Sequence, residues 1–235
     1  MKKTLIITLM AALGLCLSSC VSENSGYGYE IKDGVAVYNT PARPADQQSM
    51  LGFTVDPIDT VRVGFIGLGD RGDGAVNRFT YIDGVEIVAL CDIEQDRVED
   101  MQKLLAERGK PAADAYFGSR EAWKELCQRD DIDLVYIVTD WVNHTPMAVY
   151  AMEQGKHVAI EVPAATSIAE CWQLVDTSER TRRHCMMLEN CVYDFFELTC
   201  LNMAQQGVFG EILHAEGAYI HNLAPFWDDY HNNWR

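Results

Sequence analysis

The stretch of residues 61–92, VRVGFIGLGDRGDGAVNRFTYIDGVEIVALCD, constrains the fold of this chain most strongly. It begins with a short apolar run of mainly β-branched and aromatic residues, 61–66, which is typical of a buried parallel strand. Gly67, Gly69 and Gly72 follow at once in G-x-G-x-x-G spacing. The first glycine permits a tight turn, the second lets a phosphate approach the backbone, and the third lets the next helix pack close to the strand. The pattern therefore predicts a strand, a turn and a helix whose N-terminus binds phosphate groups.

A second apolar run, residues 85–90, ends at Cys91 and Asp92. An acid at this distance after the last glycine accepts hydrogen bonds from the ribose hydroxyls of NAD, and it repels the 2′-phosphate of NADP. The glycine pattern alone occurs by chance, and the alternative is a tight turn between a strand and a helix in some other α/β domain. Strand, glycines, helix, strand and acid in this order favour dinucleotide binding, with NAD as the cofactor.

The pattern of strand and helix continues along the chain. Strands are expected at 116–117, 134–138, 158–160 and 186–188. Helices are expected after Asp92, around Trp123, from Thr145 as N-cap, from Ile168, and over 195–203. This alternation predicts an α/β fold, a doubly wound parallel sheet of the Rossmann type, with ligands at the carboxyl ends of its strands.

From Glu211 onward apolar and polar residues alternate, which predicts the first long strand of a second, α+β domain with an antiparallel sheet. One strand cannot bury a face by itself, so we expect this domain to be truncated. The expected organisation is a lipoprotein signal peptide over 1–20, a tether and extended arm over 21–60, an NAD-binding domain over 61–190, and the start of an incomplete substrate domain over 191–235.

The N-terminus has the features of an export signal. Lys2 and Lys3 precede an apolar segment, residues 5–15, which is too short to span a bilayer comfortably. The sequence Leu-Ser-Ser-Cys that ends at Cys20 resembles a bacterial lipobox, and an ordinary secretory signal is the alternative. We expect an exported, membrane-anchored lipoprotein at the periplasmic face or the cell surface. Because the net charge of −16 repels nucleic acid and anionic lipid, membrane contact is expected only through a lipid on Cys20.

Six cysteines remain after the signal segment, and none forms a C-x-x-C pair, which disfavours zinc and thioredoxin-like chemistry. Most are expected to be buried, small, apolar side chains, and we expect no metal site. A disulfide stays open, as does a homo-oligomer. The six are Cys91, Cys127, Cys171, Cys185, Cys191 and Cys200.

Polar residues gather where the expected strands end. Each by itself has an ordinary structural explanation, such as packing for Trp141, capping for His144 or pairing with Lys156 for Glu161. Because the carboxyl ends of the strands meet in a doubly wound sheet, together they predict a site around the reactive ring of the cofactor. They are Thr139, Asp140, Trp141, His144, Glu161, Val162, Pro163, Glu189, Asn190 and Tyr193, with Tyr219 and His221 on the later strand.

Several segments carry a family resemblance: GFIGLGDRG, CDI and HTPMAVYAMEQGKHVAIEVP. They resemble the glucose–fructose oxidoreductase/inositol dehydrogenase family (Gfo/Idh/MocA). That family usually has Glu-Lys-Pro where this chain has Glu161-Val162-Pro163, and its lysine helps to move the substrate's hydroxyl proton. Valine cannot do this. The sequence from about Arg43 to the end closely resembles the branch that carries this departure, glycoside hydrolase family 109, which are bacterial α-N-acetylgalactosaminidases.

The resemblance assigns roles to individual residues. The NAD contacts it implies are Asp70, Arg71, Asp92, Trp141, Val142, Asn143, His144, Glu161, Val162 and Asn190, in addition to the three glycines. It implies that Tyr219 and Arg235 contact the sugar. Tyr193 and His221 are the candidates for catalysis near the reacting carbons. The family's further sugar-binding residues are expected beyond Arg235.

The resemblance also implies a mechanism and a substrate, a terminal α-linked N-acetylgalactosamine (GalNAc) of a glycan or small molecule. NAD⁺ oxidises C3 of the sugar, the C2 proton becomes acidic, the C1–O bond breaks by elimination, water adds at C1, and the hydride returns. Such NAD-dependent glycosidases need no opposed pair of carboxylates. Two alternatives stay open: an exported NAD(P)-dependent sugar oxidoreductase, and an inactive nucleotide-binding fragment.

Overall fold

The computed structural model describes residues 29–38, 47–218, 220, 222 and 224. The described residues up to Glu189 form one compact unit, and those from Asn190 onward form a second. The signal segment 1–20 lies outside the described residues, as do 21–28 and 39–46 of the expected tether and arm. No helix in the described part of the chain combines the length and the hydropathy that crossing a bilayer would require.

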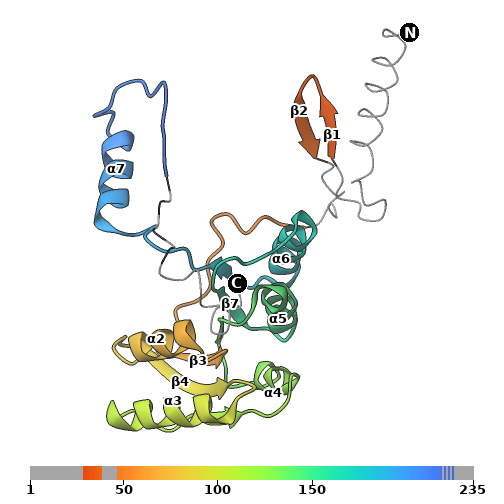
Figure 1. Cartoon of the computed structure of the whole chain (residues 1–235), viewed down its shortest axis with the longest axis vertical. Coiled ribbons are helices and arrows are strands. Elements are labelled where there is room, and N and C mark those ends of the chain that lie inside the picture. Colours follow the sequence, from red (N-terminus) through yellow and green to blue (C-terminus); the bar gives the residue numbers. More distant parts are fainter. Residues whose placement is uncertain (1–28, 39–46, 219, 221, 223, 225–235) are drawn as a thin grey trace. The chain divides into compact units, whose positions relative to one another are not determined.

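The first unit contains a parallel six-stranded sheet (Figure 1). Its strands are β3 (Val61–Ile66), β4 (Val85–Cys91), β5 (Asp114–Tyr116), β6 (Leu134–Ile137), β7 (His157–Ile160) and β8 (Cys185–Met187). Their order across the sheet is β5-β4-β3-β6-β7-β8. From β3 the chain adds β4 and β5 on one side of the sheet, and then adds β6, β7 and β8 on the other side of β3. This is the doubly wound order, and it confirms the predicted fold class.

Helices cover both faces of the sheet. They are α2 (Asp70–Phe79), α3 (Gln95–Glu107), α4 (Ala122–Cys127), α5 (Trp141–Glu153) and α6 (Ile168–Thr181). Buried residues of α2 and α3 share one apolar cluster with Phe65 of β3, and those of α4, α5 and α6 share another with Ile66. Successive residues of a strand point to opposite faces, so each central strand contributes to both clusters.

A bulge in β4 shifts its pairing with β3 by one residue. Val63 of β3 pairs with Ile87, whereas the next residue, Gly64, pairs with Ala89. Val88 is the extra residue, so Ile87 and Leu90 both face α2 and α3 although they are three positions apart. Gly64 is needed on the other face, because a Cβ there would lie 2.8 Å from Cδ2 of Leu126.

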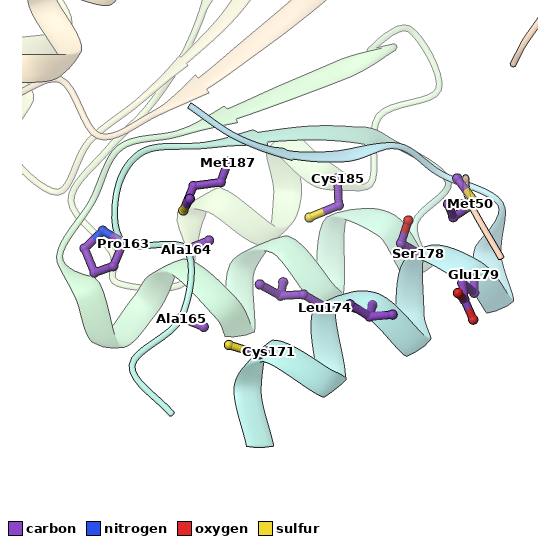
Figure 2. A pocket seen from close by; sticks show the side chains of 11 residues that line it. Met50, Pro163, Ala164, Ala165, Cys171, Leu174, Ser178, Glu179, Cys185 and Met187 are labelled. Carbon is purple, nitrogen blue, oxygen red and sulfur yellow. The ribbon is translucent and has the colours of Figure 1, made fainter. Parts of the chain in front are cut away.

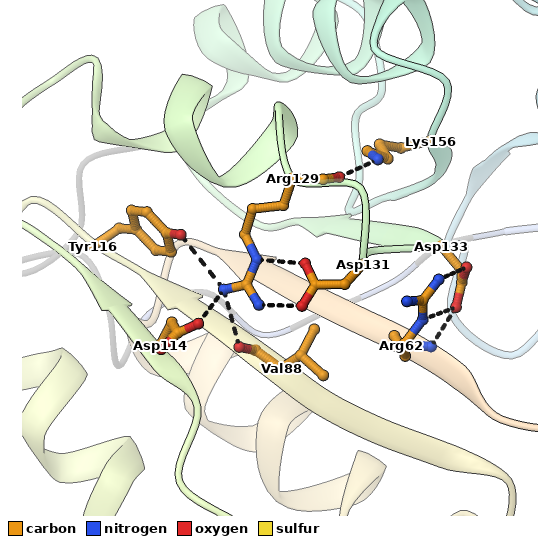
Figure 3. Close-up of polar contacts among 8 residues, drawn as sticks. All are labelled: Arg62, Val88, Asp114, Tyr116, Arg129, Asp131, Asp133 and Lys156. Atoms are coloured by element: carbon orange, nitrogen blue, oxygen red, sulfur yellow. Dashed lines mark hydrogen bonds and ion pairs between the residues drawn. The ribbon is translucent and has the colours of Figure 1, made fainter.

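Charged side chains fix the loop that leads into β6 (Figure 3). The Arg62 guanidinium donates two hydrogen bonds to the Asp133 carboxylate, from Nε to Oδ2 at 2.9 Å and from Nη2 to Oδ1 at 2.7 Å. Arg129 donates in the same bidentate way to Asp131, at 2.7 and 2.6 Å. Lys156, which is buried, donates to the Arg129 carbonyl. These contacts join the starts of β3 and β6 and are structural.

A two-stranded antiparallel hairpin, β1 (Tyr29–Lys32) and β2 (Val35–Tyr38), lies within the segment that the sequence predicts as a tether. Asp33 and Gly34 form its turn with φ of +52° and +80°. An Asp-Gly pair is the usual sequence signal for such a turn, so Asp33 and Gly34 could have predicted this hairpin. Residues 47–60 contain no helix or strand. Within them the Phe53 ring lies 4.2 Å from the Arg182 guanidinium, which attaches this segment to the end of α6.

The second unit contains α7 (Phe195–Gln205), close to the predicted bounds. Gly207 follows it with φ of +73°. The strand predicted from Glu211 is wrong for the described residues, because 211–218 have no strand pairing. Alternation marks a chain that is suited to a sheet, but a strand forms only where another strand accepts its backbone hydrogen bonds.

Candidate cofactor site

The carboxyl ends of β3, β4, β6 and β7 meet along one edge of the sheet. Backbone hydrogen bonds continue past the strands and align the loops: Gly67 N donates to Cys91 O at 2.8 Å, Val138 N to Ile66 O at 2.9 Å, and Glu161 N to Ile137 O at 2.9 Å. The strand order reverses between β3 and β6, and this is the position where doubly wound folds bind their ligands.

The glycine turn after β3 has no room for side chains at two of its three glycines. Gly67 has φ of +94°, and a Cβ there would lie 2.5 Å from the Val138 carbonyl oxygen. A Cβ on Gly72 would lie 2.2 Å from the Gly67 carbonyl oxygen. Both contacts are to backbone, which cannot move aside. The first and third glycines therefore serve the turn and the close packing of α2, as the motif predicts.

The second glycine leaves the start of α2 open to a ligand. Gly69 is the N-cap, so no side chain caps the first turn. Asp70 and Arg71 follow it and are exposed. The amides of a helix N-terminus attract anions. An uncapped helix start behind a turn that excludes side chains fits the pyrophosphate of a dinucleotide.

Asp92 lies directly after β4, and its side chain is only 5% exposed. Its Oδ2 accepts a hydrogen bond from Leu68 N at 2.7 Å, and its Oδ1 accepts one from Glu94 N at 3.0 Å. The backbone on both sides therefore fixes this carboxylate beside the glycine turn. Since a carboxylate can accept about four hydrogen bonds, capacity remains for ribose hydroxyls. Arg97, which the sequence did not indicate, lies 3.6 Å from Oδ2 through its Nη1.

Glu161 connects the end of β7 to the glycine turn. Its Oε1 accepts hydrogen bonds from Arg71 Nε at 3.1 Å and from the Tyr136 hydroxyl at 3.0 Å. Burial, and then the nearby Glu161 carboxylate, raise the pKa of Tyr136 well above its ordinary value, so the phenol stays protonated and donates. Sequence reasoning missed Tyr136, because an aromatic residue inside a buried strand has no signal beyond packing.

The turn after β6 begins α5 earlier than the sequence predicts. Asp140 is the N-cap, and its Oδ1 accepts from Asn143 N at 3.2 Å. Thr145 therefore lies inside the helix, and its prediction as N-cap is wrong: Asp140, five residues earlier, makes the stronger cap. Trp141 is 38% exposed and Val142 is 70% exposed. These two first-turn residues can meet a ligand at this edge.

His144 joins two loops of the site. It is 1% exposed, with Nδ1 at 2.7 Å from the Pro163 carbonyl oxygen and Nε2 at 3.1 Å from the Thr139 carbonyl oxygen. Thr145 donates from its hydroxyl to the Ala164 carbonyl at 2.9 Å. The His144 ring thus holds the loop after β6 against the loop after β7, and it is covered by protein.

The remaining predicted residues lie in three places. Val162 is 37% exposed beside Glu161 and presents only an aliphatic side chain. Asn190 and Tyr193 belong to the second unit, where Tyr193 is 68% exposed. Outside the described residues are Tyr219, His221 and Arg235.

A cavity of about 410 Å³ lies apart from these residues, between α6, β8 and the loop after β7 (Figure 2). Leu174 and Cys171 of α6 and Cys185 and Met187 of β8 line it. The lining is mainly apolar. It includes Pro163 but none of the polar or charged residues predicted for the cofactor or the sugar, so we do not assign the cavity to the nucleotide.

The expectation that most cysteines are buried is wrong. Cys91 and Cys127 are buried and Cys185 is half-buried, whereas three others are exposed: Cys171, Cys191 and Cys200. Helix and loop positions outside the central strands explain the difference, because an apolar run buries a cysteine only where another layer covers it.

The comparisons with known proteins agree with this geometry. A family model described as "Oxidoreductase family, NAD-binding Rossmann fold" (GFO_IDH_MocA) matches residues 61–189. The chain is 60% identical, over its whole length, to glycosyl hydrolase family 109 protein 1 of Bacteroides thetaiotaomicron, and covers 50% of that protein. It is 58% identical to a glycosyl hydrolase family 109 protein of Porphyromonas gingivalis, covering 97% of this chain and 49% of the relative. The predicted resemblance is confirmed, and the chain spans about half the length of these relatives.

Solved structures show the same fold. Scyllo-inositol dehydrogenase of Lactobacillus casei, with bound NAD(H) and scyllo-inositol, matches with a TM-score of 0.58 and 21% identity, covering 65% of this chain and 43% of that one. Myo-inositol 2-dehydrogenase of Lactobacillus plantarum matches with a TM-score of 0.55 and 22% identity, over 65% of this chain and 43% of that one. These structures show the fold. The family model, which matches more than half of the chain, shows that the chain belongs to the Gfo/Idh/MocA family, and NAD is the cofactor of its Rossmann fold.

Proposed function

We propose that the protein is a glycosidase that removes terminal α-linked GalNAc and uses NAD without consuming it. The similarity of the whole chain to proteins named glycosyl hydrolase family 109 carries this proposal. The substrate and the mechanism come from the resemblance described above. Because the chain spans half of these relatives, the activity is proposed for the whole protein.

Val162 stands where the resemblance to the wider family leads us to expect a lysine. It follows Glu161 at the edge of the site, where its side chain is 37% exposed. An aliphatic group can neither accept nor donate the proton of a sugar hydroxyl, which a dehydrogenase must remove as hydride leaves. Oxidation of C3 in the proposed mechanism releases the same proton, so a residue other than Val162 would have to accept it.

The described residues would hold and orient the cofactor. The start of α2 and the glycine turn would bind the pyrophosphate, Asp92 the ribose hydroxyls, and Glu161 would keep Arg71 in place. When bound, NAD supplies a hydride acceptor and donor for C3 of the sugar. Tyr193, Tyr219, His221 and Arg235 are proposed to act on the sugar.

The test uses the chain and a chimera in which it is joined to the remaining half of the Bacteroides thetaiotaomicron relative. The chimera should release p-nitrophenol from p-nitrophenyl α-GalNAc, and GalNAc formed in D₂O should carry deuterium at C2. The same chimera with Gly72→Ala is the control and should lose both activities. Hydrolysis without deuterium at C2 would reject the elimination mechanism. Accumulation of NADH in step with sugar oxidation would instead identify a sugar oxidoreductase.

We also propose that the protein is an exported lipoprotein anchored through Cys20, as the lipobox-like sequence suggests. Cells that express the chain should incorporate labelled palmitate into it and retain it in the membrane fraction. Cys20→Ser should abolish the label and release the protein. Equal labelling of both proteins would contradict the proposal, and an unlabelled, secreted wild type would identify an ordinary signal peptide.

A further inference from the structure

Arg97 lies between the acidic residue of the cofactor site and the glycine turn. It is in the first turn of α3, five residues after Asp92, and half of its side chain is exposed. Its Nη1 lies 3.6 Å from Asp92 Oδ2. The same nitrogen would lie 3.4 Å from a Cβ on Gly69. The guanidinium therefore occupies the adenosine end of the predicted site, where the ribose and the turn meet.

Asp92 is held by backbone hydrogen bonds as well as by its ion pair with Arg97. Hydrogen bonds from Leu68 N and Glu94 N already hold both carboxylate oxygens of this buried side chain. The separation of 3.6 Å between Arg97 and Asp92 is longer than a hydrogen bond, so charge holds this pair together. A half-exposed guanidinium held in this way can turn its donors toward a ligand while Asp92 stays in place.

These contacts bear on the choice between NAD and NADP. A buried carboxylate at this position repels a 2′-phosphate, and an arginine beside it attracts one through paired N–H donors. The two side chains carry opposite charges and would therefore have opposite effects on a phosphate at the 2′ position of the ribose. The sequence indicates Asp92 alone, and an arginine beside it would reduce the repulsion of a 2′-phosphate.

We propose that Arg97 is a specificity-determining residue of the cofactor site. It offsets the charge of Asp92 and contacts the adenosine ribose, so the chain binds NADP as well as NAD, with a preference for NAD that is smaller than Asp92 alone would impose. The proposal rests on the NAD site of the Rossmann fold, and it stands whether or not the protein is a glycosidase.

The experiment measures dissociation constants of NAD⁺ and NADP⁺ for the purified 235-residue chain, by competition against NADH fluorescence. Arg97→Ala should raise the ratio of the NADP⁺ constant to the NAD⁺ constant by about tenfold, because one charge-assisted contact to phosphate is lost. Arg97→Lys keeps the charge without the paired donors and should raise the ratio less. Thermal unfolding of each variant checks that it is folded.

Arg108→Ala is the matched control. Arg108 follows the other end of α3, where it donates to Asn77 and lies over the Tyr81 ring. This variant loses the same charge from the same helix, so any general effect on anionic ligands appears in both variants. For Arg108→Ala, the ratio of the NADP⁺ dissociation constant to the NAD⁺ dissociation constant should stay within about twofold of wild type, since no contact to the cofactor site is lost.

Three results would overturn the proposal. One is a ratio that is unchanged in folded Arg97→Ala, and another is an equal weakening of both cofactors. The third is a wild-type chain that binds NAD⁺ but shows no competition by NADP⁺ at millimolar concentration. A wild-type chain that binds neither cofactor would reject the nucleotide site itself, and this proposal with it.

Discussion

Arg71 Nε donates to Glu161 Oε1 across 3.1 Å, which joins the first turn of α2 to the end of β7. The strand between them, β6, contributes the Tyr136 hydroxyl to the same oxygen. Glu161 is largely buried and Arg71 is half exposed, so the pair extends from the core to the ligand-facing surface of the turn. Through this contact Glu161 orients Arg71, the cationic side chain next to the glycine turn. Glu161 can do so although Val162 stands where the family usually has a lysine.

Glu161→Gln tests this role. The amide keeps the shape of the side chain but removes its negative charge. The ion pair with Arg71 becomes a hydrogen bond to a neutral oxygen, and the bond from Tyr136 becomes a neutral one, which is roughly half as strong. We expect NADH affinity to fall by about 5- to 30-fold, the equivalent of 1–2 kcal/mol. Fluorescence titration measures it. Glu153→Gln, which breaks an ion pair to Arg180 on the surface, should leave the affinity unchanged. Equal affinities in wild type and Glu161→Gln would show that Arg71 is positioned by other contacts.

Gly72→Ala and Gly74→Ala form a matched pair within α2. A Cβ on Gly72 would meet the Gly67 carbonyl oxygen at 2.2 Å, whereas a Cβ on Gly74 would meet only the mobile end of Arg78, at 3.2 Å. We expect Gly72→Ala to lose about 1–3 kcal/mol of stability through backbone strain and to lose measurable NAD binding. Gly74→Ala should bind NAD normally and gain up to about 1 kcal/mol from helix propensity. Urea unfolding and cofactor titration of both variants measure these effects, and normal NAD binding by Gly72→Ala would contradict the close packing of turn and helix.

The sequence predicted the parts of the molecule whose signal is local. Strand runs such as 134–138 and the glycine turn are set by residue types within a few positions, so their order and the fold class followed directly. Contacts between distant segments left no such signal. Arg71 and Glu161 are 90 positions apart, and nothing in either neighbourhood indicates the other. A strand likewise needs a neighbouring strand to pair with, and the alternation after Glu211 did not produce a strand among the described residues.

Capping shows how a local rule can select the wrong residue. Thr145 followed by Pro146 has the composition of a helix start, yet the helix begins at Trp141 because Asp140 accepts from Asn143 N. Thr145 instead donates to Ala164, in the loop after β7. The Asp140 cap and the packing of His144 and Thr145 against that loop together set the start of the helix.

The Arg62–Asp133 pair predicts a pH dependence of stability. Hydrogen bonds from Arg62 lower the pKa of Asp133 below its ordinary value, which is about 3.9 in an unfolded chain. A depressed folded pKa means that the stabilisation is complete above about pH 4 to 5 and is lost as the pH falls through the folded pKa. We expect Asp133→Asn to lower the melting temperature at pH 6, and the difference from wild type to shrink as the pH falls below about 4, as the melting temperatures of both proteins across this range would show. A constant difference at all pH values would mean that the charge of Asp133 contributes nothing.

The exposure of the cysteines predicts which thiols react in the folded protein. Burial raises the pKa of Cys91 and of Cys127 to about 12, so almost no thiolate forms at neutral pH and neither sulfur is accessible. Iodoacetamide at pH 7.5 should therefore modify the exposed Cys171 and leave Cys91 and Cys127 unmodified, as peptide mass spectrometry would show. Denaturation in urea before labelling is the control and should make all three react at similar rates. Rapid native labelling of Cys91 would mean that the end of β4, and with it Asp92, opens readily, which would contradict a preformed acidic residue at the cofactor site.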